Sequence, residues 1–277
     1  MIIIITITIL LGIAMGSFIN AYDWRTEQSL KPKRKNAKQY SILTGRSVCP
    51  KCKHVLGGLD LIPIFSWLFL RGKCRYCKKS ISVQYPLVEA ITLILFILSY
   101  VVWPIPLSTP VEIALYVAWL SALVVLVALS LYDIKRMLLP NKMIYQLLIF
   151  SLVIVYLNLM KNGYSWHNLL GPGFGLVVGG GIFYVIYQIS QGKWIGGGDV
   201  KLGAVLGILL GSASFSFMMI FLSSVLALVV SLPLVMSGKT NRKTLIPYGP
   251  FLIAATYIIF LFGGRIIVLL NGRGIYF

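Results

Sequence analysis

Two aspartates stand at unusual places in a strongly apolar chain. The sequence has 277 residues, and only seven of them are acidic. Asp133 ends one long apolar run, whereas Asp199 follows three glycines and opens another apolar run. Acids near a bilayer core are costly, and those that are kept usually serve a function. Two carboxyl groups in close contact share one proton, so one activates water while the other polarises a peptide carbonyl. The pair predicts aspartic-protease chemistry.

Simpler structural roles exist for both acids. Asp199 could be only the N-terminal cap of the next helix, and Asp133 could be only a partner for Lys135 or Arg136. For each aspartate considered alone, the structural role and the catalytic role are about equally plausible. Both aspartates are predicted at the same depth in the membrane, which favours catalysis, because acidic residues inside a membrane usually have a function. Glycines 196–198 fit this interpretation, since they leave room for an extended substrate and tolerate unusual dihedral angles.

The four cysteines form two C-x2-C pairs, Cys49 with Cys52 and Cys74 with Cys77. The number of residues between the two pairs is slightly larger than in a usual zinc ribbon. Each pair offers two thiolates from one tight knuckle, and two knuckles complete a tetrahedral shell. Four thiolate ligands leave no open coordination position. The pattern therefore predicts a structural zinc site, with two unmetallated dithiols as the alternative.

The elements that carry these residues are predicted from hydropathy. The chain is 58% hydrophobic and 12% charged, whereas a soluble domain carries roughly twice that charge. Several apolar runs reach the roughly 20 residues that cross a bilayer. We expect an all-α integral membrane protein of about eight transmembrane helices with a small cytoplasmic zinc-ribbon-like insert. The expected spans are residues 2–22, 85–102, 111–132, 143–159, 169–190, 200–210, 215–236 and 249–270.

This pattern divides the chain into three parts: a first transmembrane helix at 1–22, a basic insert with the cysteines at 23–84, and a seven-helix protease domain at 85–277. No basic residue precedes the first span, so we expect it to be retained and not cleaved as a signal. The span at 200–210 is short, since a helix of that length covers only about 16 Å of a roughly 30 Å core. Local bilayer thinning, a watery recess and a re-entrant loop are all open accounts. Its glycines at four-residue spacing favour close packing against another helix.

The basic residues set the expected orientation. More than half of the 25 Lys and Arg lie between residues 25 and 79. Their alternation between loops follows the positive-inside rule when the insert is cytoplasmic and both termini are outside. The reducing cytosol then opposes disulfides between the cysteines. We expect the basic run at 31–38 to contact anionic lipid headgroups, and we expect no nucleic-acid partner.

The ordered motifs resemble the bacterial type IV prepilin peptidase family, whose members are GxGD-type aspartyl membrane proteases. The resemblance covers most of the chain. The motifs are residues 16–20, both cysteine pairs, 60–67, 70–74, 81–89, Asp133 with Pro140 and Asn141, the GxGD box 196–199 with Val200 and Lys201, and 247–251. Two modest departures are the longer basic stretch 31–38 and Leu139, where isoleucine is common.

The resemblance implies an eight-span enzyme of the bacterial inner membrane. Such enzymes remove a short basic leader from prepilins or from pilin-like subunits of secretion and DNA uptake. The family's catalytic aspartates fall on Asp133 and Asp199. The candidate substrate-binding residues are Gly196, Gly197, Gly198, Lys201, Pro140 and Asn141.

Many members of the family also N-methylate the new N-terminus with S-adenosylmethionine, and the cysteine insert is tied to that activity. No glycine-rich nucleotide fold is visible in 23–84, so methylation rests on the resemblance. Asp60 and Glu89 are candidate contributors.

Other interpretations make different predictions. A proton-coupled transporter or channel would pair membrane acids in a relay, but it predicts broken helices in repeated halves and a polar track through the bilayer. Most spans here lack an ionisable residue at mid-membrane. A non-enzymatic zinc-ribbon scaffold leaves the GxGD box unexplained. A presenilin-like protease shares GxGD chemistry, but its substrate sites lie deeper and the cysteine insert is foreign to it.

Overall fold

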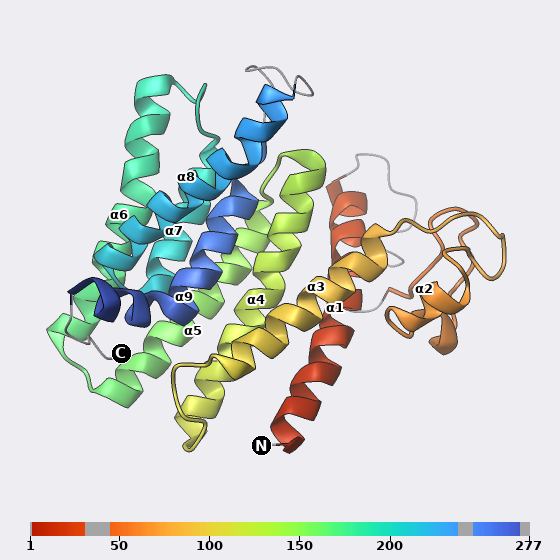
Figure 1. Ribbon diagram of the computed structural model, residues 1–277, viewed down its shortest axis with the longest axis horizontal. Coiled ribbons are helices and arrows are strands. Elements are labelled where there is room, and N and C mark those ends of the chain that lie inside the picture. Colours follow the sequence, from red (N-terminus) through yellow and green to blue (C-terminus); the bar gives the residue numbers. More distant parts are fainter. Residues whose placement is uncertain (1, 31–44, 238–245, 272–277) are drawn as a thin grey trace. The chain divides into compact units, whose positions relative to one another are not determined.

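The computed structural model is almost entirely helical, and it describes residues 2–30, 45–237 and 246–271. Within these ranges two pairs of residues form isolated β-bridges, and no β-strand is present. The prediction of an all-α protein is confirmed. In chain order (Figure 1) the elements are α1 (Ile2–Leu30), η2 (Gly58–Leu61), α2 (Phe65–Phe69), α3 (Gln84–Val101), α4 (Pro110–Arg136), α5 (Asn141–Asn162), α6 (Trp166–Ser190), α7 (Gly197–Leu210), α8 (Ala213–Met236) and α9 (Gly249–Asn271).

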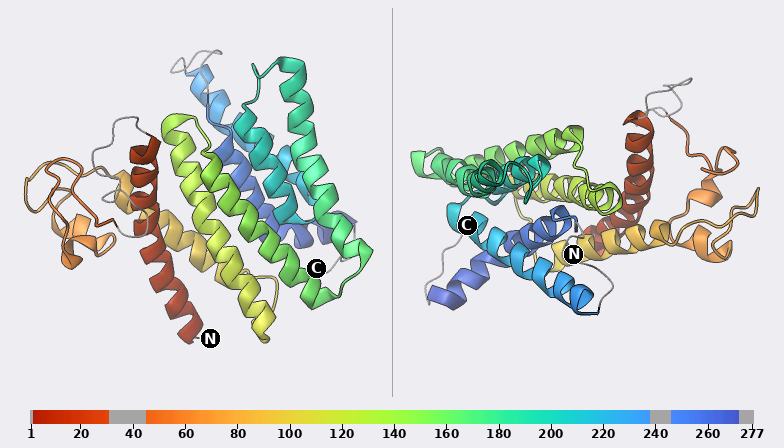
Figure 2. Two further views of the ribbon diagram at one scale, coloured as in Figure 1. Left: turned by 180° about the vertical axis from the view of Figure 1, so that it is seen from behind. Right: turned by 90° about the horizontal axis from the view of Figure 1, so that it is seen from above.

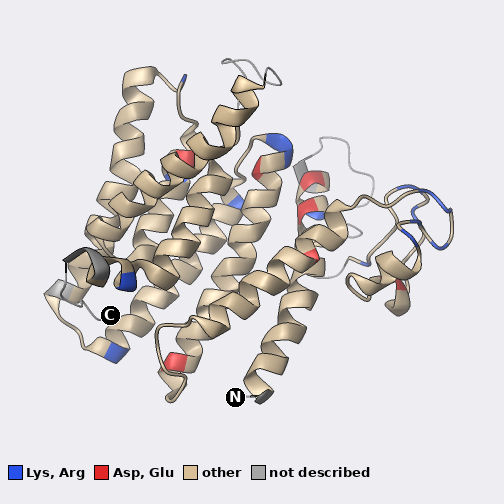
Figure 3. Cartoon of the chain, viewed as in Figure 1, with Lys and Arg blue, Asp and Glu red and all other residues tan. Residues whose placement is uncertain are grey.

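Seven of the described helices are long and apolar enough to cross a membrane: α1, α3, α4, α5, α6, α8 and α9. Their bounds lie within a few residues of the predicted spans, except at the end of α1. The eighth apolar helix is α7, with 14 residues, which rise about 21 Å and fall short of a roughly 30 Å hydrocarbon core. The short span that hydropathy indicated is therefore a short helix. Figure 3 shows that most charged residues lie near helix ends or in the insert.

Helix α1 continues well beyond its predicted end at residue 22 and stops at Leu30. Residues 23–30 contain neither proline nor glycine, so nothing in them breaks the helix. Hydropathy detects only the apolar part of a helix, which explains the difference. The basic run at 31–38, for which we expect lipid contact, lies outside the described residues.

The chain divides into two compact units, residues 1–101 and 102–277. In the first unit α1 packs against α3. Gly16 allows this close approach, because a Cβ atom there would lie 2.6 Å from the Cα atom of Glu89. The insert between the two helices carries the cysteine knuckles together with η2 and α2.

In the second unit the short helix α7 contacts α5, α6, α8 and α9, and Figure 2 shows this bundle in two further views. The closest packing joins α6 to α7. At three glycines of α6, a Cβ atom would collide with a backbone carbonyl of a glycine in or just after α7; the pairs are Gly171 with Gly211, Gly175 with Gly207, and Gly179 with Gly203. The close packing predicted from the glycines of α7 is confirmed.

Candidate active site and metal centre

Asp133 lies in the last turn of α4 and is 5% exposed. The turn is closed by Met137, which adopts a left-handed conformation and donates its N–H to the Asp133 carbonyl at 2.7 Å. The Asp133 carboxylate accepts a hydrogen bond from the backbone N–H of Gly249 at 3.2 Å. Gly249 is the first residue of α9, and a Cβ atom there would lie 2.6 Å from Asp133 Oδ2. The carboxylate is therefore held against the start of the last helix, and a side chain at position 249 would have to displace it.

Asp199 lies in the first turn of α7, where Gly196 is the N-cap residue. Its N–H donates to the Gly196 carbonyl at 3.0 Å, and its carboxylate folds back to a hydrogen bond with the Gly196 backbone. The side chain is half-buried, while Gly196 and Gly197 are exposed. Gly196 is therefore the N-cap in place of Asp199, which is the third residue of the helix and lies beside an accessible glycine segment.

Asp133 and Asp199 are near enough for their carboxyl groups to interact electrostatically. The side chain of Leu139 contacts both backbone segments that hold them. Its Cβ atom lies 3.2 Å from where a Cβ of Gly198 would be, and its Cδ2 atom lies 3.6 Å from the same point at Gly249. One leucine therefore joins the glycine segment before Asp199 to the turn that binds Asp133.

A hydrogen bond between Lys201 and Asn141 connects the start of α5 to the helix that carries Asp199. The Lys201 ammonium donates to Asn141 Oδ1 at 3.0 Å, across 60 residues of sequence. Asn141 is the first residue of α5, and Pro140 is its N-cap. All the residues predicted as catalytic or substrate-binding therefore gather where α4, α5, α7 and α9 begin or end.

Sequence reasoning missed two members of this site, Gly249 and Leu139. The Pro-Tyr-Gly-Pro segment at 247–250 predicts a turn, but not that one of its N–H groups would reach an acid 116 residues away. The turn is anchored by Tyr248, whose hydroxyl hydrogen-bonds Ser223 Oγ at 2.6 Å.

The four cysteines form one cluster in the first unit. All of their Sγ atoms lie within 4.8 Å of one another, so they could hold a metal ion, and none forms a disulfide. The spread of the sulfur atoms is compatible with a tetrahedral shell at Zn–S bonds of about 2.3 Å. Burial disfavours a thiolate at Cys49, but N–H groups of Cys52 and Lys51 outweigh it and lower the pKa of Cys49 to about 7. The predicted four-cysteine set is therefore assembled with one thiol that ionises readily.

The two cysteine knuckles are built alike. In each, the first cysteine donates its N–H to the carbonyl five residues on, and the residue after the second cysteine donates back to it. The four bonds are Cys49 to His54 at 2.9 Å, Lys53 to Cys49 at 2.9 Å, Cys74 to Lys79 at 2.9 Å and Lys78 to Cys74 at 3.0 Å. Lys53 and Lys78 both have positive φ, at 61° and 58°. The same turn, used twice, directs both pairs of sulfur atoms at one point.

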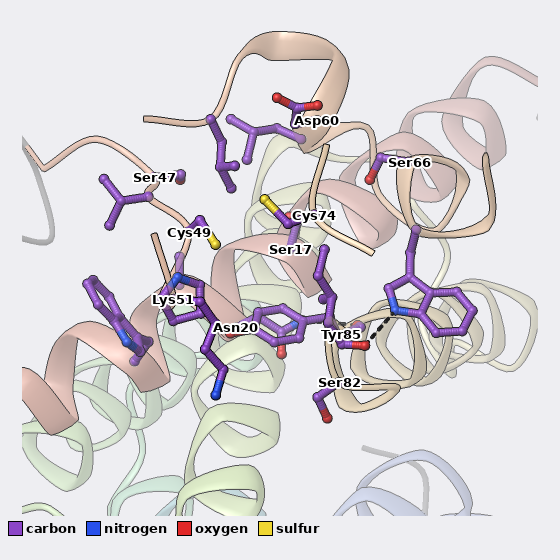
Figure 4. Close-up of a pocket in the computed structure, with 18 of the residues that line it drawn as sticks. Ser17, Asn20, Ser47, Cys49, Lys51, Asp60, Ser66, Cys74, Ser82 and Tyr85 are labelled. Carbon is purple, nitrogen blue, oxygen red and sulfur yellow. Dashed lines mark hydrogen bonds between the residues drawn. The ribbon is translucent and has the colours of Figure 1, made fainter. Parts of the chain in front are cut away.

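Asp60 and Glu89, the two acids named as candidate contributors to a second activity, line one cavity of about 510 Å³ in the first unit. Figure 4 shows the sulfur atoms of Cys49 and Cys74 among the side chains that surround it. The cysteine cluster therefore contributes Cys49 and Cys74 to the wall of this cavity.

Comparison with known proteins supplies two family matches. Residues 10–103 match the model of the Bacterial Peptidase A24 N-terminal domain, a range close to the first unit. Residues 119–232 match the Type IV leader peptidase family. No solved structure matches the chain.

Similar curated proteins carry the name prepilin leader peptidase/N-methyltransferase. The protein of Aeromonas salmonicida (strain A449) is 30% identical over 94% of this chain and 91% of its own length. The corresponding protein of Pseudomonas aeruginosa is 31% identical, over 94% and 90%. That of Bacillus subtilis (strain 168) is 31% identical, over 95% and 96%.

Proposed function

Because the chain belongs to the type IV leader peptidase family, we propose that it is an inner-membrane endopeptidase that removes the leader of prepilins or pilin-like subunits, with Asp133 and Asp199 as its catalytic acids. One observation carries the assignment: Leu139 packs against both the glycine segment that precedes Asp199 and the Gly249 turn that binds Asp133, so the two carboxyl groups lie at one junction beside exposed glycines. The cleavage site is at the cytoplasmic face of the membrane, where we also place the cysteine insert; both termini lie outside.

The mechanism follows from the shared proton of the pair. The ionised carboxylate takes a proton from a water molecule, and the water oxygen attacks the carbonyl carbon of the scissile peptide bond. The protonated carboxyl donates to the carbonyl oxygen. The C–N bond then breaks as a proton passes to the leaving nitrogen, which regenerates the pair. General acid–base catalysis of this kind contributes roughly 10²- to 10⁴-fold to the rate.

The surrounding residues suit an extended peptide. Gly196 and Gly197 present exposed backbone without side chains, so a substrate strand can lie close to Asp199. Gly198 packs against Leu139 and keeps the segment in place. The hydrogen bond from Lys201 to Asn141 holds the neighbouring helix start. We assign these residues, together with Pro140, to substrate binding.

The experiment that tests this function uses the purified full-length protein in detergent with a full-length type IV prepilin. We expect a faster-migrating product whose mass corresponds to loss of the leader. The Pseudomonas aeruginosa relative, acting on the same prepilin, is the positive control. A prepilin that the relative processes and this enzyme leaves intact would refute the proposal.

The names of the relatives support a second step, N-methylation of the newly exposed amino terminus. S-adenosylmethionine would supply an electrophilic methyl group. In that transfer the lone pair of the unprotonated amine forms the new C–N bond, the carbon–sulfur bond breaks with its electrons going to sulfur, and a proton leaves the amine to a base. Mass spectrometry of the processed pilin would show an added methyl group.

We further propose that the cysteine cluster holds a structural zinc ion. Its four thiolates would fill the tetrahedral shell and leave no position for substrate. Elemental analysis of the purified protein should find about one zinc per chain, and Cys49→Ser with Cys74→Ser should lose it. Because the ligands must be deprotonated, acid should release the metal. A stable preparation that is metal-free and still methylates would contradict this assignment.

The basic insert gives the protein a second expected neighbour, the anionic headgroups of the inner leaflet. Lys51, Lys53, Lys73 and Arg75 surround the cysteines in sequence, and basic residues near a membrane surface bind acidic lipids. We propose lipid contact, and no nucleic acid, for this surface.

A further inference from the structure

The cavity in the first unit has the size of a cofactor site. Its volume of about 510 Å³ lies within the 300–1,000 Å³ that small-molecule sites commonly have. Five segments build it: α1, the first cysteine knuckle, the η2–α2 segment, the second knuckle and the start of α3. A cavity to which five segments contribute is specified by the fold of the whole unit.

Aromatic rings form part of its wall. Trp24 of α1, Trp67 of α2 and Tyr85 of α3 all line the cavity. The Trp67 indole is held by a hydrogen bond from Nε1 to the Ile81 carbonyl at 3.2 Å. It also packs over Gly72, where a Cβ atom would come within 2.9 Å of the ring. Fixed aromatic faces bind flat heterocycles by stacking and attract cations.

The polar lining carries both signs of charge. Asp60 and Glu89 provide acids, whereas Arg25, Arg46 and Lys51 provide bases. Burial disfavours ionisation of Asp60, but hydrogen bonds from Arg75, the Gly57 N–H and Tyr76 prevail and lower its pKa. The carboxylate accepts from Arg75 Nε at 2.6 Å. Such a lining complements a zwitterion better than a ligand of one charge.

A strained turn is fixed beside the cavity by Glu89. Ile64 has φ 62° and ψ −55°, and Phe65 donates its N–H to the Pro63 carbonyl at 2.6 Å. These values describe a γ-turn of the rare, positive-φ form, at a β-branched residue for which positive φ is an outlier. The Ile64 N–H donates to Glu89 Oε2 at 2.6 Å.

The turn joins η2 to α2, and the residues on both sides of it, Leu61 and Ser66, line the cavity. Strain of this kind persists where the surroundings hold it and gathers at functional sites. The Glu89 carboxylate, which we call the clamp because it holds the Ile64 turn, also contacts α1, where Ser17 hydrogen-bonds it. Glu89 thereby ties three elements of the wall together.

We propose that this cavity binds the methyl donor S-adenosylmethionine, and that Glu89 is the positioning residue that holds the aromatic wall for it. The proposal rests on the N-methyl transfer proposed above. The aromatic rings suit the adenine ring and the sulfonium charge. The mixed acids and bases suit the amino and carboxylate groups of the donor's amino-acid end. The cysteine cluster forms one side, so metal binding maintains the shape of the site.

The first test measures binding without any turnover. Full-length zinc-loaded protein in detergent is dialysed to equilibrium against radiolabelled S-adenosylmethionine, and the bound donor is then cross-linked by ultraviolet light and mapped by mass spectrometry. We expect saturable binding of about one donor per chain, with cross-links on peptides that line the cavity. Absence of binding, or cross-links confined to residues 102–277, would overturn the proposal.

Variants test the clamp. Glu89→Ala should weaken donor binding roughly tenfold or more, since the Ile64 N–H loses its carboxylate acceptor and the strained turn is released. Glu89→Gln should lose much less, because its amide oxygen still accepts the Ile64 N–H. The matched control is Phe69→Ala, in α2 but 83% exposed and outside the cavity lining, which should bind as the parent does. Wild-type binding by Glu89→Ala would refute the clamp.

Two further readouts keep the results separable. If Glu89→Ala loses its zinc, the insert has unfolded, and the cross-link map of the unsubstituted protein decides the matter. Unsubstituted protein that cleaves and methylates pilin while its cavity binds no donor would refute this inference alone. Failure to cleave any prepilin would instead refute the proposed function.

Discussion

Replacement of either Asp133 or Asp199 by asparagine is expected to abolish leader cleavage, with a loss of about a thousandfold or more. Asparagine has nearly the same shape but neither accepts nor donates the catalytic proton. The fold should survive, because the amide oxygen at position 133 can still accept the N–H of Gly249 that the carboxylate now binds at 3.2 Å. The measurement is the rate of prepilin processing by purified protein, with thermal unfolding in detergent to check the fold.

The matched control is Glu112→Gln. It neutralises another acid of the same helix α4, at the opposite end, where Glu112 pairs with Thr109 in a capping box. Glutamine preserves that cap, so cleavage should continue at the parental rate. Full activity in both aspartate variants would show that the two carboxyl groups are structural and would end the protease mechanism. Equal loss in all three variants would point to a general effect of charge removal.

Gly175→Ala is expected to lower the stability of the protein strongly. Its new methyl group would collide with the backbone carbonyl of Gly207. A helix backbone cannot relieve this clash by changing rotamer, as a flexible side chain could. Overpacking of this kind costs about 1–3 kcal/mol or more. Because α7 also carries Asp199, displacing it should lower cleavage as well. Thermal unfolding in detergent and the processing rate are the two measurements.

Gly173→Ala provides the control, since it lies in the same helix α6 and a Cβ atom there would meet nothing within 4 Å. It should unfold at or slightly above the parental temperature, because alanine favours helix over glycine. Unfolding of Gly175→Ala at the parental temperature would mean that α6 and α7 can separate at no cost. That result would contradict the idea that the close contact between α6 and α7 holds Asp199 in position.

The helices were predictable from the sequence because lipid imposes a simple requirement, a run of apolar residues long enough to span it. The same signal could not find the end of α1, since residues 23–30 are mostly polar yet continue the helix. The pairing of the two acids was predicted from their matched depth at helix ends. The hydrogen bond from Gly249 was not predicted, because it depends on how α4 and α9 pack across 116 residues.

The cysteine spacing predicted the four-sulfur cluster because ligand geometry is local to each knuckle. The neighbouring cavity left no such pattern in the sequence. Its walls come from α1, both knuckles, α2 and α3, so no single stretch shows a nucleotide-binding motif. The strained turn at Ile64 was equally hidden, since isoleucine is a residue that ordinarily avoids positive φ. Asp60 and Glu89 were named from the sequence only as candidate contributors to methylation.

The hydrogen bond from the Gly249 amide to Asp133 limits which residues can replace Asp133 if the enzyme loses its activity in evolution. A lineage that no longer needs proteolysis still needs an acceptor there, because the amide that opens the last helix would otherwise be buried without a partner. Inactive descendants should therefore carry asparagine at position 133 more often than alanine or leucine. At position 199, which is only half-buried, a wider range of replacements should survive.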